Sequence, residues 1–344
     1  MSPTESIVWN GTDESVSTAR FGDLRFTKPG TYNIEVSEVL PEGTVAYDLN
    51  GDGVNDVALC ANNNIVYDLH TYTYIVTVRD DNQGYLTTTW SGATGGAVFT
   101  NSVGFELTKE VTSSQPIEGE LAGKQFAFEI VLDNQEDQDP YNGSCLIRYE
   151  RNDGTSSVEK LAFADGKASV ILAHEDKAYI YAPGGRSFTI TERQQAGWTL
   201  TNPATGVFEG TLVPNTPLAV GFTNEYKAST EDQPVLIAAT KQLDGRDMKA
   251  GEFKFTIQGC AVGTNGDATF VDIANGVNIS GKDGVASPIV FGDETGDWSF
   301  TYDLDSLAQA VKDGYATRTL VDGRAQWTLN YRVSELTGEL PIGV

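Results

Sequence analysis

The chain of 344 residues has few of the side chains on which enzyme active sites and metal centres usually depend. It contains two histidines, His70 and His174, and neither lies near a serine or cysteine elbow that would indicate a nucleophilic triad. The three cysteines, Cys60, Cys145 and Cys260, are spread along the chain without zinc-site spacing. We therefore expect unpaired cysteines, surface histidines and no enzyme with multiple turnovers.

Basic residues and long apolar runs are also scarce. Lysine and arginine number 23 against 48 acidic residues, which gives a formal net charge of −25. Such a charge opposes binding to nucleic-acid phosphates and to anionic lipid. No apolar run is long enough to cross a bilayer as a helix. We therefore exclude nucleic acid as a partner and expect no membrane insertion in this segment.

Alternation of apolar and polar residues dominates the sequence instead. Short runs rich in Val, Ile, Thr, Tyr and Phe are separated by clusters of Gly, Asn and Asp. This pattern predicts an all-β fold of tandem immunoglobulin-like sandwiches. One short helix is expected in the last part of the chain, with Asp305 or Ser306 as its cap and its end near Gly314.

Polar residues recur on faces that the alternation assigns to the core. Lys109 and Lys241 each end an apolar strand, and each is followed by a strongly alternating strand that contains Phe126 or Phe253. A second pattern, aromatic-x-aliphatic-x-Glu, points a glutamate inward, and a third, Phe-Thr-Asn, does the same for an asparagine. The glutamates are Glu38, Glu192 and Glu335, and the asparagines are Asn101 and Asn224.

The order of these patterns predicts the domain organisation. Only the middle of the chain contains all three, as Lys109, Glu192 and Asn224. The first part has a glutamate and an asparagine without a lysine strand, and the last part has a lysine and a glutamate without an asparagine strand. We therefore expect a complete sandwich at 105–228 between a partial one at 1–104 and a partial one at 229–344, as in a segment of a longer tandem array.

Three converging polar groups in an apolar sandwich indicate chemistry, because an unpaired buried charge costs several kcal/mol. Taken singly, a lysine or glutamate near a strand end is more often a rim residue that reaches solvent. Burial favours a neutral amine and a protonated acid. A neutral Lys109 amine can attack the Asn224 carboxamide while Glu192 supplies a proton, which gives an amide between side chains and releases ammonia.

These residues resemble the isopeptide-linkage domains of Gram-positive surface proteins, of the streptococcal major-pilin and Cna B types. The similar segments include TKQLDGRDMKAGEFKFTI from Thr240 to Ile257, RFTKPGTYNIEVSE from Arg25 to Glu38, and YIVTVRDDNQGYL from Tyr74 to Leu86. The resemblance implies Cna B-like sandwiches in which a first-strand lysine is joined to a last-strand asparagine beside a catalytic glutamate. It assigns these roles to Lys109, Asn224 and Glu192.

By the same resemblance, Glu38 and Asn101 belong to a bond whose lysine lies outside the sequence, and Lys241 and Glu335 to one whose asparagine does. The implied protein is a structural segment of a pilin, stalk or adhesin that crosslinks itself once. It would be extracellular, on the cell surface, and attached to the cell wall in the full-length protein. The expected partners are neighbouring domains or subunits of the same surface protein.

A loop with the sequence DLNGDGVND predicts a calcium site, although the isopeptide chemistry requires no cofactor. Its oxygen donors fall at alternate positions with a glycine at the sharp turn, and Leu59 replaces the glutamate that would end an EF-hand loop. Tight Asn-Gly and Asp-Gly turns are the alternative explanation. The candidate ligands are Asp48, Asn50, Asp52, Asp56 and the carbonyl of Val54.

The alternative function is a ligand-binding adhesin module for a host glycan or protein, with calcium stiffening the loop. An exposed aromatic cluster around Trp90 or Trp198 would favour it. No pair of carboxylates has a spacing that singles out a glycosidase.

Overall fold

The structure, a computed structural model, describes residues 24–94, 96–132, 140–213, 216, 218–231, 233, 235–262, 268–291 and 298–337. These residues form strands and one short helix, which confirms the all-β prediction. The chain divides into two compact units. Unit 1 contains residues 1–110, 125–193 and 202–223, and unit 2 contains residues 111–124, 194–201 and 224–344. The division into segments 1–104, 105–228 and 229–344 stays a prediction.

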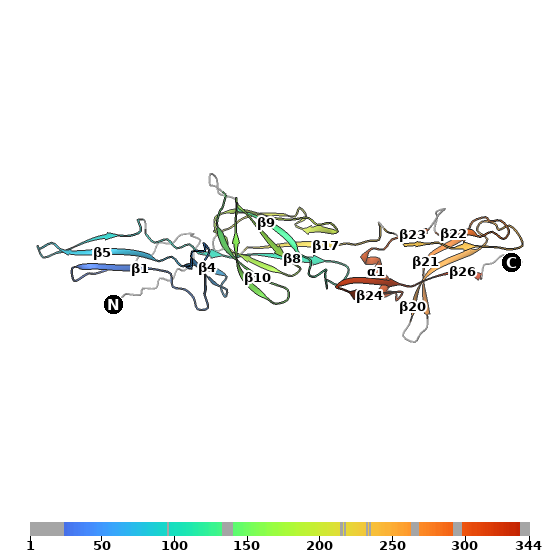
Figure 1. The fold of residues 1–344 in the computed structure, drawn as a ribbon, viewed down its shortest axis with the longest axis horizontal. Helices are drawn as coiled ribbons and strands as arrows, with labels where there is room; N and C mark the ends of the chain where they lie inside the picture. The colour runs from blue at the N-terminus through green and yellow to red at the C-terminus, as the bar shows by residue number, and fades with distance from the viewer. Residues whose placement is uncertain are drawn as a thin grey trace. The chain divides into compact units, whose positions relative to one another are not determined.

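The first part of unit 1 forms two small antiparallel sheets. One has the strand order β1-β5-β6 and the other has the order β2-β3-β4-β7. Strand β1 pairs with β5 over its whole length, as Figure 1 shows. The bounds are β1 Gly30–Val36, β2 Val45–Tyr47, β3 Val57–Cys60, β4 Ile65–Asp68, β5 Tyr72–Asp80, β6 Leu86–Ser91 and β7 Ser102–Val103.

A sandwich follows, built from a six-stranded sheet, β11-β10-β13-β8-β17-β15, and a four-stranded sheet, β12-β9-β14-β16. Ring contacts between Phe105 and Phe188, and between Phe128 and Phe222, pack the two sheets face to face. The bounds are β8 Phe105–Thr112, β9 Phe126–Leu132, β10 Ser144–Glu150, β11 Ser156–Ala162, β12 Lys167–Leu172, β13 Lys177–Ile180, β14 Ser187–Glu192, β15 Trp198–Asn202, β16 Val207–Thr211 and β17 Ala219–Tyr226.

The alternation of β8 and β9 determines which side chains enter this core. Phe126, Phe128 and Ile130 of β9 are buried, and the residues between them are half-buried. In β8 the same alternation buries Leu107 and Lys109 on one face. Each large apolar side chain contributes about 1.5–3 kcal/mol by burial, so a one-residue slip of either strand is strongly disfavoured. The register therefore holds Lys109 inside the sandwich.

Strands β8 and β17 are neighbours in the six-stranded sheet, and Figure 1 shows them side by side. The Glu106 amide donates to the Leu218 carbonyl at 2.8 Å, and the Thr108 hydroxyl donates to the Val220 carbonyl at 3.5 Å. Both contacts advance by two residues in the same sense, so the strands run parallel. Parallel neighbours need a crossover connection, which here includes strands β9 to β16.

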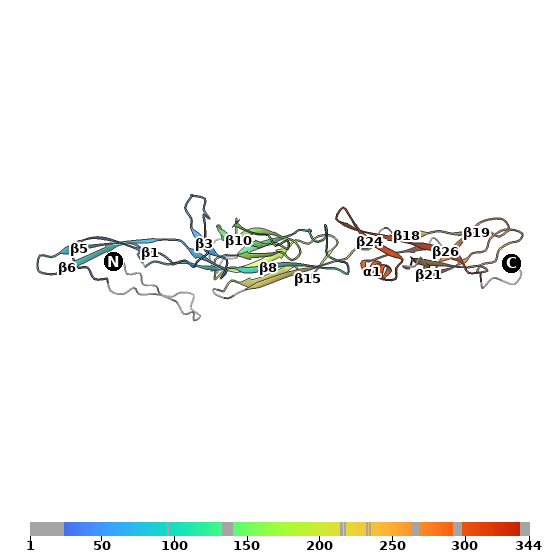
Figure 2. The same ribbon diagram turned by 90° about the horizontal axis from the view of Figure 1, so that it is seen from below.

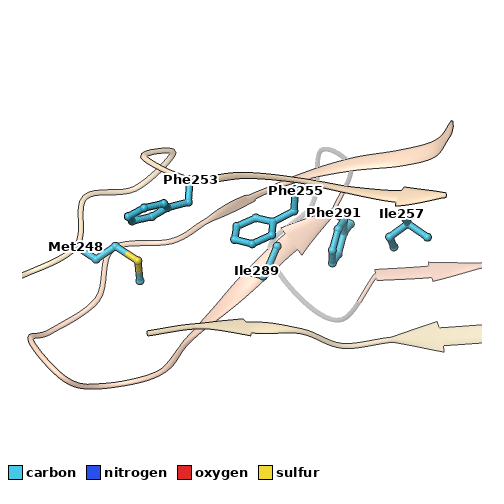
Figure 3. Close-up of a cluster of buried hydrophobic side chains, with 6 residues drawn as sticks. All are labelled: Met248, Phe253, Phe255, Ile257, Ile289 and Phe291. Carbon is cyan, nitrogen blue, oxygen red and sulfur yellow. The ribbon is translucent and has the colours of Figure 1, made fainter. Parts of the chain in front are cut away.

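Unit 2 contains a five-stranded sheet, β19-β22-β21-β20-β26, and two two-stranded sheets, β18-β23 and β24-β25. Its core includes Met248, Phe253 and Ile289, and Figure 3 shows Phe255 and Ile257 pointing to the same side of β20, toward Phe291. The bounds are β18 Val235–Ile237, β19 Thr240–Lys241, β20 Lys254–Val262, β21 Ala268–Asn278, β22 Ser287–Phe291, β23 Trp298–Phe300, β24 Ala316–Val321, β25 Arg324–Leu329 and β26 Tyr331–Glu335.

The expected helix is present as α1, Leu304–Lys312, but its cap differs from the prediction. Asp303, rather than Asp305 or Ser306, accepts the Ser306 amide, and the Ser306 hydroxyl accepts the Asp303 amide. This capping box needs a residue with extended backbone at the cap, and Asp303 has it. The helix lies beside β24, as Figures 1 and 2 show, with Ala310 packed in the same cluster as Ala316.

Unit 2 also includes residues 111–124, which form the end of β8 and most of the connection from β8 to β9. The Gln115 side-chain amide donates to the Leu304 carbonyl at 2.9 Å, in a buried position. At the tip of the β24–β25 hairpin, the Gly323 carbonyl accepts the Glu120 amide at 2.8 Å. Gly119, with φ of +58°, approaches Gly323 so closely that a Cβ there would lie 2.3 Å from its oxygen. Hydrogen bonds and close backbone packing therefore hold this connection against the helix and the hairpin.

Candidate functional site

Lys109 is 1% exposed, although lysine is rarely buried unless it is paired. Its Nζ lies 3.2 Å from Oε2 of Glu192, which ends β14 and is 4% exposed. The two sheets of the sandwich thus bring together a lysine and a glutamate that are far apart in the sequence. The pair is completely enclosed, since neither side chain has exposed surface.

An aromatic ring completes the surroundings of the amine. Nζ of Lys109 lies 4.3 Å from the centroid of the Phe126 ring. The face of the ring attracts a cation, and its bulk excludes water from the amine. The alternation of the sequence predicts Phe126 as a core residue but does not assign it to the site.

Burial lowers the pKa of Lys109 to about 8, from an ordinary value of 10.5, because the charged amine loses its hydration. The Glu192 carboxylate opposes this effect and favours the charged amine, but desolvation is the larger influence. With a pKa of about 8, roughly a tenth of the amine is neutral at pH 7, about 300 times the fraction for an ordinary lysine. Such an amine has a usable population of its nucleophilic form.

Asn224 lies on β17, the strand beside β8, and is 1% exposed. It shares the buried face of its strand with Val220 and Phe222, as the alternation predicts. All three members of the predicted triad are therefore buried polar residues, and the six-stranded sheet places the lysine and asparagine strands next to each other.

The second predicted pair, in unit 2, is also in contact. Lys241 Nζ lies 2.9 Å and 3.1 Å from the two carboxylate oxygens of Glu335. It also lies 4.4 Å from the centroid of the Phe253 ring, as Lys109 does beside Phe126. The side chains of this pair are 22% and 28% exposed, so solvent screens their attraction.

Glu38 and Asn101 of unit 1 are brought together as well. The Asn101 side-chain amide donates to Oε1 of Glu38 at 2.7 Å, and its oxygen accepts the Asp68 amide at 3.0 Å. Burial is the main cause of the raised pKa of Glu38, and the negative charge of Asp68 adds to it. Asp68 has no signal in the sequence, because its contact with Asn101 joins residues that are 33 positions apart.

The prediction that Asn101 faces the core is wrong, because its side chain is exposed. Asn101 precedes the two-residue strand β7 and lies in a segment without regular structure. Strict alternation of faces holds only within a strand, so it could not be extended to this residue.

The two aromatic rings beside the amines had a detectable signal in the sequence. Each lysine strand is followed by an alternating strand with a phenylalanine at or just before its start, Phe126 in one case and Phe253 in the other. Because the same order of lysine strand and phenylalanine occurs twice, it could have assigned both rings to the lysine sites. Periodicity alone identified them only as core residues.

The acidic loop is organised by hydrogen bonds of its own. Asp48 accepts the amides of Gly51 at 2.6 Å and Gly53 at 2.8 Å, which lowers its pKa. The Asn50 side-chain amide donates to both Asp52 and Asp56. Within the described residues, no three Asp, Glu, His or Cys side chains gather as a group that could hold a metal ion. Calcium stays a prediction for this loop, and Val54 offers only a backbone carbonyl there.

The remaining sequence expectations concern aromatic residues, thiols and membrane spans. Trp198 is buried against Tyr226, with ring centroids 4.8 Å apart, so it is not part of an exposed aromatic cluster. Trp90 is 64% exposed, but on β6 rather than on a loop.

His70 is exposed and His174 is half-buried. The three cysteines are free thiols. No helix in the described part of the chain is long and apolar enough to cross a membrane.

Two family models match the chain. Residues 2–104 match the Spy0128-like isopeptide containing domain, and residues 103–226 match a domain of unknown function, DUF7601. The two matched regions meet at residues 103–104. No curated protein matches the chain.

Solved structures of pilus proteins are also similar to parts of the chain. The pilus-presented adhesin Spy0125 (Cpa) is 20% identical over 46% of this chain and 37% of its own, with a TM-score of 0.29. The major pilin from Streptococcus pyogenes is 19% identical over 59% of this chain and 72% of its own, also with a TM-score of 0.29. The chain thus spans little more than a third of the adhesin. The family match at residues 2–104 confirms the resemblance inferred from the sequence: the chain carries a pilin-type, Spy0128-like isopeptide domain.

Proposed function

We propose that the chain is a structural segment of a cell-surface pilin, stalk or adhesin, stiffened by an amide bond between Lys109 and Asn224. The observation that carries this proposal is the completely enclosed contact between Lys109 and Glu192, with Nζ and Oε2 3.2 Å apart. A buried lysine and glutamate contribute little net stability as an ion pair, because desolvation offsets their attraction. Their burial is better explained by a reaction.

The reaction requires only these three side chains. A proton first passes from the Lys109 ammonium to the Glu192 carboxylate, 3.2 Å away, and leaves a neutral amine beside a protonated acid. The neutral Lys109 amine then attacks Cγ of Asn224 and forms the new carbon–nitrogen bond. Glu192 gives a proton to the carboxamide as this bond forms and takes one from the attacking nitrogen. The original carbon–nitrogen bond of the carboxamide then breaks, and its nitrogen leaves as ammonia. Enclosure favours each step, because reacting groups held in contact away from water need little further organisation.

The register of the sheet supports Asn224 as the electrophile. Thr108 lies level with Gly221, where a Cβ would be 3.2 Å from the Thr108 hydroxyl oxygen. The same register puts Lys109 level with Phe222, and Asn224 two residues farther along the buried face of β17. Neighbouring strands are about 4.8 Å apart and rise about 3.3 Å per residue, so an extended lysine side chain can cover this offset.

A bond between β8 and β17 would join the first and last strands of the sandwich. In the chain-entropy model, closing a loop of this length is worth about 4–5 kcal/mol, and an amide cannot be reduced as a disulfide can. Tension that enters through one of the two strands would pass directly to the other. The strands of the crossover would then carry little of it.

The proposed surface setting is supported by the match of residues 2–104 to the Spy0128-like isopeptide containing domain. We infer an extracellular, wall-attached protein whose partners are neighbouring domains or subunits. The pairs Glu38–Asn101 and Lys241–Glu335 would each serve an equivalent bond.

Intact-protein mass spectrometry tests the bond. Wild-type protein should be lighter than its sequence mass by about 17 Da, the mass of one ammonia. Glu192→Gln and Asn224→Ala should retain the full sequence mass, corrected for the substitution. Glu129→Gln, on the neighbouring strand β9 and partly exposed, is the matched control and should show the loss.

Digestion should yield one branched peptide that joins the segments containing Lys109 and Asn224. A wild-type chain with its full mass, or a loss of mass that persists in Glu192→Gln, refutes the proposal.

A further inference from the structure

The backbone of Lys109 is held from one side by a turn at residues 173–176. The Lys109 amide donates to the Asp176 carbonyl at 3.2 Å, and the Lys109 carbonyl accepts the Glu175 amide at 2.8 Å. Strands β8 and β13 pair regularly up to Thr108 and Lys177, and the turn adds these two bonds just beyond. Both backbone groups of the reactive lysine therefore depend on the position of this turn.

The turn has a conformation that needs support. The Asp176 amide donates to the Ala173 carbonyl at 3.2 Å and closes the turn, and Glu175 has φ of +62°. A positive φ in a residue other than glycine costs of order 1 kcal/mol and persists only where neighbouring contacts enforce it.

The Asp176 carboxylate supplies that support. One carboxylate oxygen accepts hydrogen bonds from Nη1 of Arg151 at 2.8 Å and from the Ala173 amide at 2.9 Å. The other oxygen accepts a hydrogen bond from the Asn152 amide at 3.0 Å. Asp176 is 3% exposed, so these bonds form away from water. Arg151 is itself held by the Tyr149 ring, 4.1 Å from its guanidinium carbon, and it donates to the Ile171 carbonyl at 3.1 Å.

We propose that Asp176 is a positioning residue for bond formation, whose buried carboxylate fixes the turn that holds the Lys109 backbone. The inference rests on the proposed function, since it concerns the same amine. Asp176 touches neither reacting group through its carboxylate. It acts through the turn, which determines where the base of the Lys109 side chain lies. Displacing a reacting group by about 1 Å can slow a reaction by about 100-fold.

The test is the rate of bond formation in the full chain. The 344-residue protein is made by cell-free synthesis, samples are quenched in acid denaturant, and the fraction that has lost about 17 Da is followed with time. Peptide mapping assigns the loss to Lys109 and Asn224. Asp176→Asn keeps the size of the side chain but removes its charge and one acceptor, and it should slow the reaction by about tenfold or more.

The pH dependence separates positioning from a change in the reacting groups. In Asp176→Asn the rate should fall by the same factor at every pH, with the midpoint of the profile unchanged. The matched control is Glu252→Gln in unit 2, where a carboxylate also pairs with an arginine, Arg246, and accepts a backbone amide. That variant should react at the wild-type rate.

A rate of bond formation in Asp176→Asn within about twofold of wild type overturns the inference. A pH profile whose midpoint shifts while its maximum rate stays unchanged overturns it as well. If Asp176→Asn does not fold, Arg151→Met and Arg151→Lys decide the question. The methionine variant should be the slower of the two and both should be slower than wild type, whereas equal rates overturn the inference. A wild-type chain that never loses ammonia refutes the proposed function instead.

Discussion

The lowered pKa of Lys109 predicts how stability should depend on pH once the bond is prevented. The perturbation compares Asn224→Ala, which keeps the free lysine, with the double variant Asn224→Ala/Lys109→Met, which removes it. Because the pKa of the folded state is about 8 and that of the unfolded chain is near 10.5, the unfolded state binds more protons between these values. Stability in the single variant should therefore rise with pH through this range.

The shift sets the size of the effect. One pKa unit corresponds to about 1.4 kcal/mol, so the complete contribution is about 3 kcal/mol. Of this, about 2 kcal/mol should be recovered between pH 8 and pH 10. Tyrosines such as Tyr179, whose pKa burial raises to about 12, titrate in both variants, and their contribution cancels in the comparison.

Urea unfolding at several pH values, followed by tryptophan fluorescence, measures the difference in the free energy of unfolding between the two variants. The free energy of unfolding of Asn224→Ala should increase relative to that of the double variant as the pH rises from 8 to 10. A constant difference would show that Lys109 is an ordinary, fully charged lysine in the folded state. The explanation of its reactivity by desolvation would then be wrong.

Three further predictions concern other parts of the chain. Glu335→Gln should lower the free energy of unfolding by at most about 1 kcal/mol in urea titrations, because its pair with Lys241 is partly exposed; a loss above about 3 kcal/mol would contradict this. Asp303→Ala should destabilise unit 2 by about 1 kcal/mol through loss of the capping box, whereas Asp305→Ala in the first turn should cost less, and equal losses would contradict the assigned cap. If the acidic loop binds calcium, the ion should raise the unfolding temperature of wild type but not of Asp48→Ala, and a wild-type temperature that a chelator leaves unchanged counts against it.

Much of the middle site could be predicted from sequence because it depends on alternation within regular strands. Lys109, Glu192 and Asn224 all lie in strands whose other inward residues are large and apolar, so the period of two places them correctly. The contact between Lys241 and Glu335 followed from the repeated order of the patterns. In both cases the sequence determines the face of the strand to which each side chain points. The fold then brings these side chains into proximity.

The features that could not be predicted depend on irregular backbone. Asn101 is exposed because it lies before a two-residue strand, in a segment where the alternation of faces does not apply. The support of Lys109 by Asp176 depends on a turn with positive φ at Glu175, a residue type that gives no signal for this conformation. The helix cap at Asp303 required its backbone angles, because Asp305 and Ser306 are also acceptable capping residues by type.

The connection between β8 and β9 has a practical consequence for dissecting the molecule. Gln115, Glu118 and Glu120 contribute hydrogen bonds and ion pairs to the helix and the hairpin of unit 2. A gene fragment that begins after β17 would encode every strand of the last sheet but omit these residues. It would leave the Leu304 carbonyl without its buried donor and the arginines of the hairpin without their carboxylates. Recombinant study of the last part of the chain therefore calls for a fragment that retains residues 111–124.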